Sequence, residues 1–255
     1  MKFETHIPCE RLRPYVRHLV ISETDGAGHY PIVPDTALVM GFQYSGKLAY
    51  LQDDGKHPLA AAGITGLLDQ YRIFQNAPGT GSVLVVFREM GLAAFVRQPA
   101  YELFDLSVSL EQLFSRQAIS DTLERLSEAA DDRERIDIVE QFLLAQLMPT
   151  DADMLVTAAL AAIRQSGGNI RIGELTTALH TSQSPLEKRF RRYVGASPKK
   201  FAGIVRFRKM IAALERGRGH LDSMAYLDHY YDQAHFIKDF KRFTSMTPEE
   251  YLRGL

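Results

Sequence analysis

The sequence has a single cysteine, Cys9, and no long apolar run. One cysteine excludes an intrachain disulfide, and a reducing cytoplasm is the simplest compartment for such a chain. A secretion signal needs an apolar core of about 7 to 15 residues, but charged residues interrupt the stretch from Met1 to Val20. No apolar run approaches the roughly 20 residues that span a bilayer. The sequence therefore predicts a cytoplasmic protein with no membrane segment.

Signals of catalytic or metal chemistry are also sparse. The N-terminal histidines form no His-x-His or His-x-x-x-His pair, which argues against a metal-dependent barrel enzyme: His6, His18, His29 and His57. No Gly-x-Gly-x-x-Gly or phosphate-loop pattern occurs, and no local Lys or His pattern activates the Cys9 thiol. We therefore expect no enzyme activity, no cofactor and no metal.

Net charge is nearly absent, since the total is −1 over 255 residues. That total conceals an acidic part followed by a basic part. Residues 1–149 carry 13 Lys+Arg against 20 Asp+Glu, or −7, whereas residues 150–255 carry 17 against 11, or +6. Between them, Pro149 disfavours helix continuation and Thr150 or Asp151 can cap a new helix. We predict a sensor or dimerisation domain over 1–149 and a second domain over 150–255.

The N-terminal part has the pattern of short strands followed by helices. Segments 37–42, 47–51, 71–74 and 82–87 are rich in β-branched or aromatic residues and are bounded by turn residues. Segments 109–115, 118–129 and 133–148 have helical spacing. The last carries an apolar stripe that suits either its own barrel or a second copy of the chain, and both remain open. These patterns predict a small cupin-like β-barrel or sandwich with following helices.

The most informative feature is an internal repeat with an offset of 50 residues. Apolar, basic and capping positions recur together: Leu186, Phe190 and Tyr193 with Phe236, Phe240 and Phe243; Lys188, Arg191 and Arg192 with Lys238, Lys241 and Arg242; Ser197, Pro198 and Phe201 with Thr247, Pro248 and Tyr251. Such self-similarity indicates a duplicated structural unit. In each unit the apolar residues share one helix face and the cations lie on the other.

The pattern of each unit predicts a short helix, a turn, a second helix with a basic outer face, and a capped helix after it. This is the layout of a helix-turn-helix DNA reader. Residues 182–218 contain 11 Lys+Arg and two acids, for a net charge of +9, which suits phosphate binding. Thr247 and Glu250 have capping-box spacing. A helix over 198–216 would join the two units. With the strands expected in the N-terminal part, these helices predict an α+β fold with an all-α C-terminal bundle.

These motifs resemble a known family. Residues 182–190 (SQSPLEKRF), 195–201 (GASPKKF) and 231–236 (YDQAHF), with FKRF at 240–243 and Thr247-Pro248, resemble the DNA-binding domain of AraC/XylS-family transcription regulators. The resemblance covers about residues 153–253. Residues 87–95 (FREMGLAAF) are similar to the variable sensor domain that precedes it in some members.

The resemblance implies roles for individual residues. Those expected to face bases are Ser184, Glu187 and Lys188 from the first recognition helix and Ala234, His235 and Lys238 from the second. Those expected to hold phosphates are Arg191, Arg192, Lys241 and Arg242. Ser182 and Asp232 are better interpreted as caps, although Ser184 could itself cap the first recognition helix with Glu187, in a Ser-x-x-Glu pattern.

Two positions depart from the family pattern. Many relatives have glycine in the turn before the second recognition helix and in the later turn, where this chain has His229 and Ser245. A left-handed backbone at such a residue would add strain of about 1 kcal/mol.

The resulting hypothesis is a sequence-specific DNA-binding transcription regulator that reads successive major-groove segments. Its expected partners are double-stranded DNA and the transcription machinery. A small-molecule effector in the N-terminal domain and a homodimer remain open, as do the operator sequence and the choice between activation and repression. The alternative from another class is a small-molecule-binding protein or barrel enzyme with an accessory helical module.

Overall fold

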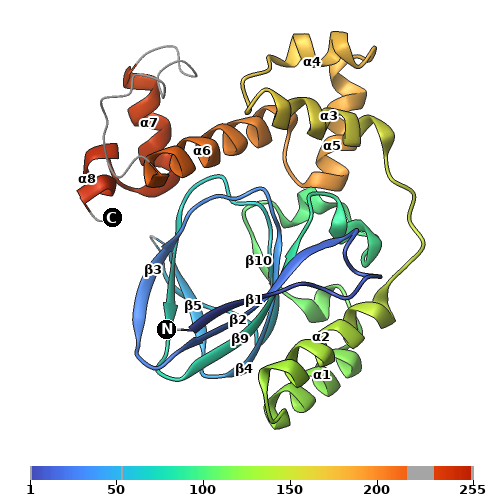
Figure 1. Ribbon diagram of the computed structural model, residues 1–255, viewed down its shortest axis with the longest axis vertical. Coiled ribbons are helices and arrows are strands. Elements are labelled where there is room, and N and C mark those ends of the chain that lie inside the picture. The colour runs from blue at the N-terminus through green and yellow to red at the C-terminus, as the bar shows by residue number, and fades with distance from the viewer. Residues whose placement is uncertain (1, 53, 217–232, 254–255) are drawn as a thin grey trace.

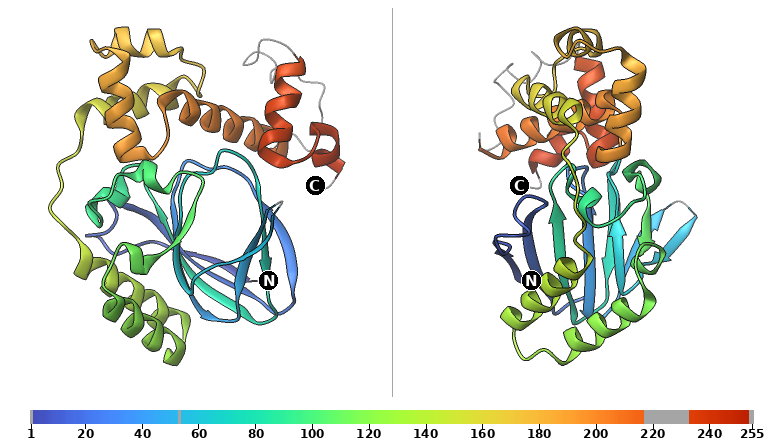
Figure 2. Two further views of the ribbon diagram at one scale, coloured as in Figure 1. Left: turned by 180° about the vertical axis from the view of Figure 1, so that it is seen from behind. Right: turned by 90° about the vertical axis from the view of Figure 1, so that its right-hand side faces the viewer.

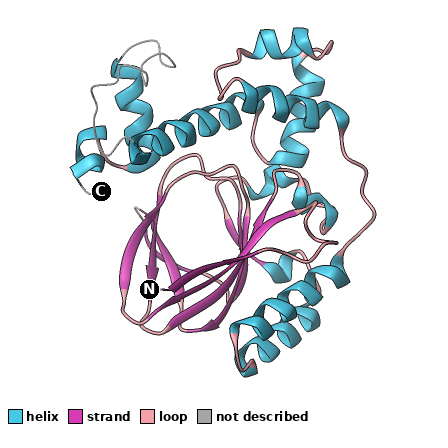
Figure 3. Ribbon diagram, in the orientation of Figure 1, coloured by secondary structure: helices cyan, strands magenta, loops and turns pink. Residues whose placement is uncertain are grey.

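The computed structural model describes residues 2–52, 54–216 and 233–253. Two antiparallel β-sheets form the N-terminal part, with helices α1 and α2 on one side and helices α3 to α8 on the other (Figures 1 and 3). The chain is therefore α+β, as the sequence predicts.

The larger sheet has six strands in the order β1-β2-β9-β4-β7-β10. They are β1 (Lys2–His6), β2 (Val16–Thr24), β4 (Val39–Ser45), β7 (Ala62–Thr65), β9 (Thr80–Phe87) and β10 (Ser107–Ser109). The smaller sheet has the order β3-β8-β5-β6, from β3 (Gly28–Ile32), β5 (Leu48–Gln52), β6 (Gly55–Pro58) and β8 (Arg72–Asn76). The predicted segments 37–42, 47–51, 71–74 and 82–87 correspond to β4, β5, β8 and β9.

The two faces of the six-stranded sheet have different neighbours, because side chains alternate along each strand. One face carries fully buried residues such as Ile21, Phe42 and Val85 and packs against α1 (Arg116–Glu128) and α2 (Asp132–Gln146). The ring centroids of Phe42 and Phe142 lie 5.3 Å apart in an edge-to-face contact. The apolar stripe of α2 therefore covers its own sheet, which settles the choice that the sequence leaves open.

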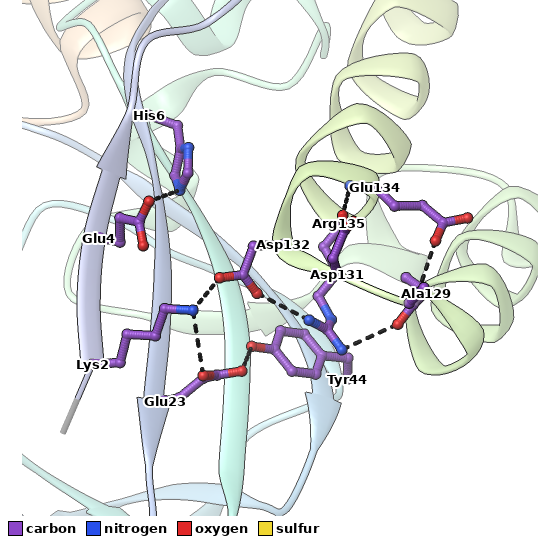
Figure 4. A network of polar contacts seen from close by, with 11 residues as sticks. Lys2, Glu4, His6, Glu23, Tyr44, Ala129, Asp131, Asp132, Glu134 and Arg135 are labelled. Carbon is purple, nitrogen blue, oxygen red and sulfur yellow. Dashed lines mark hydrogen bonds and ion pairs between the residues drawn. The ribbon is translucent and has the colours of Figure 1, made fainter.

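A polar network also fastens α2 to the sheet (Figure 4). The Lys2 ammonium binds Asp132, and Asp132 accepts a bond of 2.9 Å from Arg135. Tyr44 donates to Glu23 at 2.7 Å, and the Arg135 guanidinium lies 4.4 Å from the Tyr44 ring centroid. The hydrogen bond from Lys2 lowers the pKa of Asp132. The network ties edge strand β1 to the start of α2.

One predicted helix is wrong. Residues 109–115 do not form an α-helix: Ser109 ends β10, and only a short 3-10 helix, η3 (Leu110–Gln112), follows. The Ser109 hydroxyl accepts a bond from the Glu111 amide at 3.2 Å, which caps this single turn. Helix α1 then begins at Arg116, after Ser115. The polar side chains that favour a turn outweigh the helical spacing.

The C-terminal part consists of helices α3 (Met154–Gln165), α4 (Ile172–Ala178), α5 (Gln183–Val194), α6 (Pro198–Arg216), α7 (Gln233–Thr244) and α8 (Pro248–Arg253). After α3 the chain turns through Gly167 and Gly168, both with left-handed backbones. Figure 2 shows α6 joining the α3–α5 group to α7 and α8. Near its start α6 buries Phe201 in the core shared with α5, and further along it buries Phe207 and Ile211 in a second core with α7.

Candidate DNA-binding surface and ligand cavity

Helix α5 has a buried face and a charged face, as its sequence predicts. Leu186, Phe190 and Val194 are fully buried. Of the five predicted contact residues on this helix, four are exposed: Ser184, Lys188, Arg191 and Arg192. The fifth, Glu187, is half-exposed. Helix α5 therefore presents the three predicted contact cations to solvent beside a serine hydroxyl and a carboxylate, and Arg189, which pairs with Asp153, is exposed as well.

The start of α5 settles one ambiguity. The helix begins at Gln183, so Ser182 occupies the capping position, although its side chain accepts no capping hydrogen bond. The alternative in which Ser184 caps the helix is wrong, because Ser184 already lies in the first turn. Pro185 also falls within this turn, where its missing amide donor removes no intrahelical bond. The preceding turn contains His180 with a left-handed backbone (φ 48°).

Helix α7 repeats the packing of α5, which confirms the repeat for this helix; the first helix and the turn of the second unit lie outside the described residues. Phe236, Phe240 and Phe243 are buried, as the offset from α5 predicts. The rings of Phe190 and Phe201 pack edge to face with centroids 5.6 Å apart, and those of Phe240 and Tyr251 do the same at 5.6 Å. These two aromatic pairs are separated by 50 residues in the sequence and occupy equivalent places in the two units.

The cations of α7 also lie outward. Lys238, Lys241 and Arg242 are exposed. Ala234 and His235 lie in the first turn of the helix, but the description of these two residues covers the backbone alone. His229 and Asp232 lie outside them as well.

The turns that follow α5 and α7 have matching conformations. Gly195 has φ 99° and Ser245, fifty residues later, has φ 65°. Both residues are left-handed, although only glycine adopts this region without strain. Beyond Ser245, the Thr247 hydroxyl accepts a bond of 3.1 Å from the Glu250 amide, and the Glu250 carboxylate accepts one of 2.6 Å from the Thr247 amide. The predicted capping box is confirmed.

Carboxylates of the N-terminal part contact cations of the C-terminal part. Asp69 lies 2.8 Å from Lys200 Nζ and 3.7 Å from Arg242 Nη1. Asp35 lies 3.8 Å from Arg208 Nη2. Arg242 is one of the predicted phosphate-binding residues, and in this structure it contacts a carboxylate of the N-terminal part. Sequence reasoning missed these pairs, because each joins residues more than 100 positions apart.

A cavity of about 720 Å³ lies between the two sheets. Its volume is within the range of small-molecule sites, about 300–1,000 Å³. Much of its wall comes from the face of the six-stranded sheet that does not contact α1 and α2, including Val20, Val39 and Leu84, and the opposite wall includes Tyr30 and Phe74. The strands that form it are visible in the sequence, but the open space between them is not.

The charged residues of the cavity wall are Arg17, His18, Asp35 and Arg208. Arg208 comes from α6, so the connector between the helix-turn-helix units forms part of this wall. Arg17 donates to Glu89 at 3.2 Å. Burial and the neighbouring Arg17 cation lower the pKa of His18.

Neither a metal-binding cluster nor a membrane-spanning helix is found among the described residues. No group of three or more His, Cys, Asp or Glu side chains in this part of the chain is arranged to hold a metal ion. None of the helices found there is both long and apolar enough to cross a bilayer.

The chain matches two family models. Residues 175–254 match a family described as a helix-turn-helix domain, and residues 4–109 match a domain of unknown function (DUF6597). The first match spans helices α5 and α7. The second covers most of the strands and most of the residues that line the cavity.

The chain is also similar to a curated protein and to solved structures. An uncharacterised HTH-type transcriptional regulator of Haemophilus influenzae is 25% identical over 118 residues, which are 46% of this chain and 39% of that protein. A 1.65 Å structure of ToxT from Vibrio cholerae matches with a TM-score of 0.50 and 12% identity, covering 100% of this chain and 99% of that chain. A ToxT structure with a bound unsaturated fatty acid matches with a TM-score of 0.49 and 12% identity, covering 92% and 94%.

Proposed function

We propose that this chain, which carries an AraC-type helix-turn-helix domain at its C-terminal end, is a sequence-specific DNA-binding transcription regulator. The observation that carries the proposal is the repeated helix with a buried apolar stripe and an exposed cationic face, in α5 and again in α7. A major groove admits one such helix, and two joined units can read two successive groove segments.

The proposed roles within each helix follow from position and exposure. Ser184, Glu187 and Lys188 on α5 would contact base edges, as would Ala234, His235 and Lys238 on α7. Arg191, Arg192, Lys241 and Arg242 would bind phosphates and set the register of the protein on the duplex. The cations needed for both tasks are exposed wherever their side chains are described.

We further propose that the N-terminal part controls this activity by binding a small-molecule effector in the cavity. The cavity is large enough for such a ligand. Arg208 belongs both to its wall and to α6. A ligand that displaced the Asp35–Arg208 contact would therefore act directly on the helix that joins the two DNA-reading units.

No catalytic step is part of this proposal, and its partners are DNA, the transcription machinery and a second copy of the chain. A cytoplasmic location belongs to it as well. The free thiol of Cys9 is stable under the reducing conditions of that compartment.

The proposal is tested by titrating the full chain against its own promoter duplex and a random duplex, by fluorescence anisotropy at several salt concentrations. Lys188→Ala and Lys238→Ala should each cost about 1–3 kcal/mol on the promoter and reduce the preference over random DNA. Arg192→Ala should weaken binding to both duplexes equally and lower the salt dependence by about one counterion.

Lys56→Ala is the matched control, because Lys56 is exposed on β6 of the smaller sheet and should leave DNA affinity unchanged. Absence of salt-sensitive binding to any duplex would contradict the proposal. Equal losses on both duplexes for Lys188→Ala would show that this residue binds phosphate rather than a base.

A further inference from the structure

The wall of the cavity is arranged in successive rows across strands β2, β9 and β4. Ser22, Ser82 and Gln43 are paired in one row, Val20, Leu84 and Gly41 in the next, and His18, Val86 and Val39 in the third. All nine residues line the cavity. Rows two residues apart are separated by roughly 6.5 Å along a strand. The wall is therefore polar at the row of Ser22, Ser82 and Gln43 and apolar at the row of Val20, Leu84 and Gly41.

The polar row contains an unsatisfied group. Ser82 is only 2% exposed, and its Oγ atom has no hydrogen-bond partner among the described residues. A buried hydroxyl without a partner is destabilising by an amount comparable to a lost hydrogen bond. Ser22 lies directly opposite on β2, so two hydroxyl-bearing side chains face the same part of the cavity.

The side chains of Gln43, Asn76 and Thr80, which lie near this row, already form hydrogen bonds within the protein. Gln43 donates to the Ala60 carbonyl at 2.7 Å and accepts from the Leu48 amide at 2.9 Å. Asn76 donates to the Gly26 carbonyl at 2.7 Å, and Thr80 donates to the Ala77 carbonyl at 2.7 Å. These bonds fix the loops at this end of the sheets. Within the described part of this wall, Ser82 is a buried hydroxyl that has no hydrogen-bond partner in the protein.

No charged side chain accompanies Ser22 and Ser82 in their row. The charged wall residues are Arg17, His18, Asp35 and Arg208, and His18 lies two rows away from Ser22 on the same strand. An anion beside Ser82 would lose its hydration without gaining a cation, which is strongly unfavourable. A neutral hydroxyl, carbonyl or amide can exchange a hydrogen bond with a serine at no such cost.

We infer that the cavity binds a mainly apolar molecule whose uncharged polar group hydrogen-bonds to Ser82 and Ser22. The apolar row of Val20 and Leu84, with Tyr30 and Phe74 opposite, encloses its apolar part. This inference rests on the proposed effector site and specifies the chemical class of its ligand.

Isothermal titration calorimetry on the full chain, without DNA, tests the inference with three probes of equal chain length: 1-decanol, decanoate and decane. Decanol should bind more tightly than either of the others. Ser82→Ala should weaken decanol binding about 3- to 10-fold and leave decane binding unchanged. The same variant should keep or raise the melting temperature of the free protein, because it removes an unsatisfied hydroxyl.

Ser127→Ala is the matched control, since this exposed serine lies on α1, on the opposite side of the larger sheet. It should leave all three affinities unchanged. Tighter binding of decanoate than of decanol, an unchanged decanol affinity in Ser82→Ala, or no binding of any probe would each overturn the inference. Because no DNA is present, any of these outcomes leaves the result of the promoter titration standing, and failure of that titration leaves the ligand class standing.

Discussion

The two parts of this chain use their interiors differently. In the C-terminal part, Phe190, Phe207 and Phe240 are fully buried, and aromatic rings pack against one another. In the N-terminal part only one face of the larger sheet is packed in this way, and the other face encloses about 720 Å³ of space. The outer surfaces differ as well, since the hollow part is acidic and the solid part is basic. A close-packed core holds helices in fixed positions, whereas an interior with a cavity can admit a ligand.

The largest expected effect is on the free energy of unfolding, and it distinguishes the close-packed interior from the interior that contains the cavity. Phe190→Ala should destabilise the protein by about 3–5 kcal/mol, because it opens a void in a close-packed core. Leu84→Ala should cost less than about 2 kcal/mol, because that side chain already borders open space. Urea denaturation followed by circular dichroism measures both. Equal costs would show that the cavity collapses in solution.

A smaller effect distinguishes the two helix-turn-helix units. Ser245→Gly should stabilise the protein by about 1 kcal/mol, because glycine adopts a left-handed backbone without strain. The reverse change at the equivalent position, Gly195→Ser, should destabilise it, since an added Cβ would lie 3.2 Å from the Ala100 carbonyl oxygen. Thermal unfolding of both variants checks this. A loss of stability in Ser245→Gly would mean that the serine side chain matters more than the backbone.

The smallest effect concerns the charge contrast between the two parts. Asp69→Asn should raise DNA affinity about 2- to 5-fold, because it releases Lys200 and Arg242 from a carboxylate that competes with phosphate. The gain is limited because partly exposed ion pairs contribute up to about 1 kcal/mol. Asp54→Asn is the control, since Asp54 is exposed and pairs with His57 instead. Unchanged affinity in Asp69→Asn would mean that the two parts separate before DNA binds.

Local patterns predicted much of the fold. The helix expected over 198–216 is α6 (Pro198–Arg216), because strong caps and a continuous helical pattern act over a few residues. The repeat identified Phe240 and Tyr251 as the counterparts of Phe190 and Phe201, and in the structure each of these two pairs is in contact. The helix expected over 109–115 failed, since one serine side chain there decides between a turn and a helix. Strands β1, β3 and β6 are short and largely exposed, and they lack the alternation that identifies a strand.

In the candidate site, too, some features follow from the local sequence and others depend on distant segments of the chain. Exposure of Lys188, Arg191 and Arg192 follows from helix periodicity, because burying Leu186 and Phe190 turns these cations outward. The unsatisfied Ser82 hydroxyl does not follow from its sequence, because its environment depends on strands β2 and β4, more than 35 residues away. Alternating Ser and Thr at 22, 24, 80 and 82 is the signal that could have indicated a polar end, once the register between β2 and β9 was known.

By itself the sequence determined the duplicated basic helices, the caps of the helices that follow them and the change of charge near residue 150, because helix periodicity and capping act over short stretches of chain. The tertiary structure alone decided that α2 covers its own sheet, that a cavity remains between the two sheets, and that Asp69 lies against Lys200 and Arg242. Each of these depends on segments distant in the sequence. Their meeting is set by strand register and by the packing of whole elements, which no local pattern specifies.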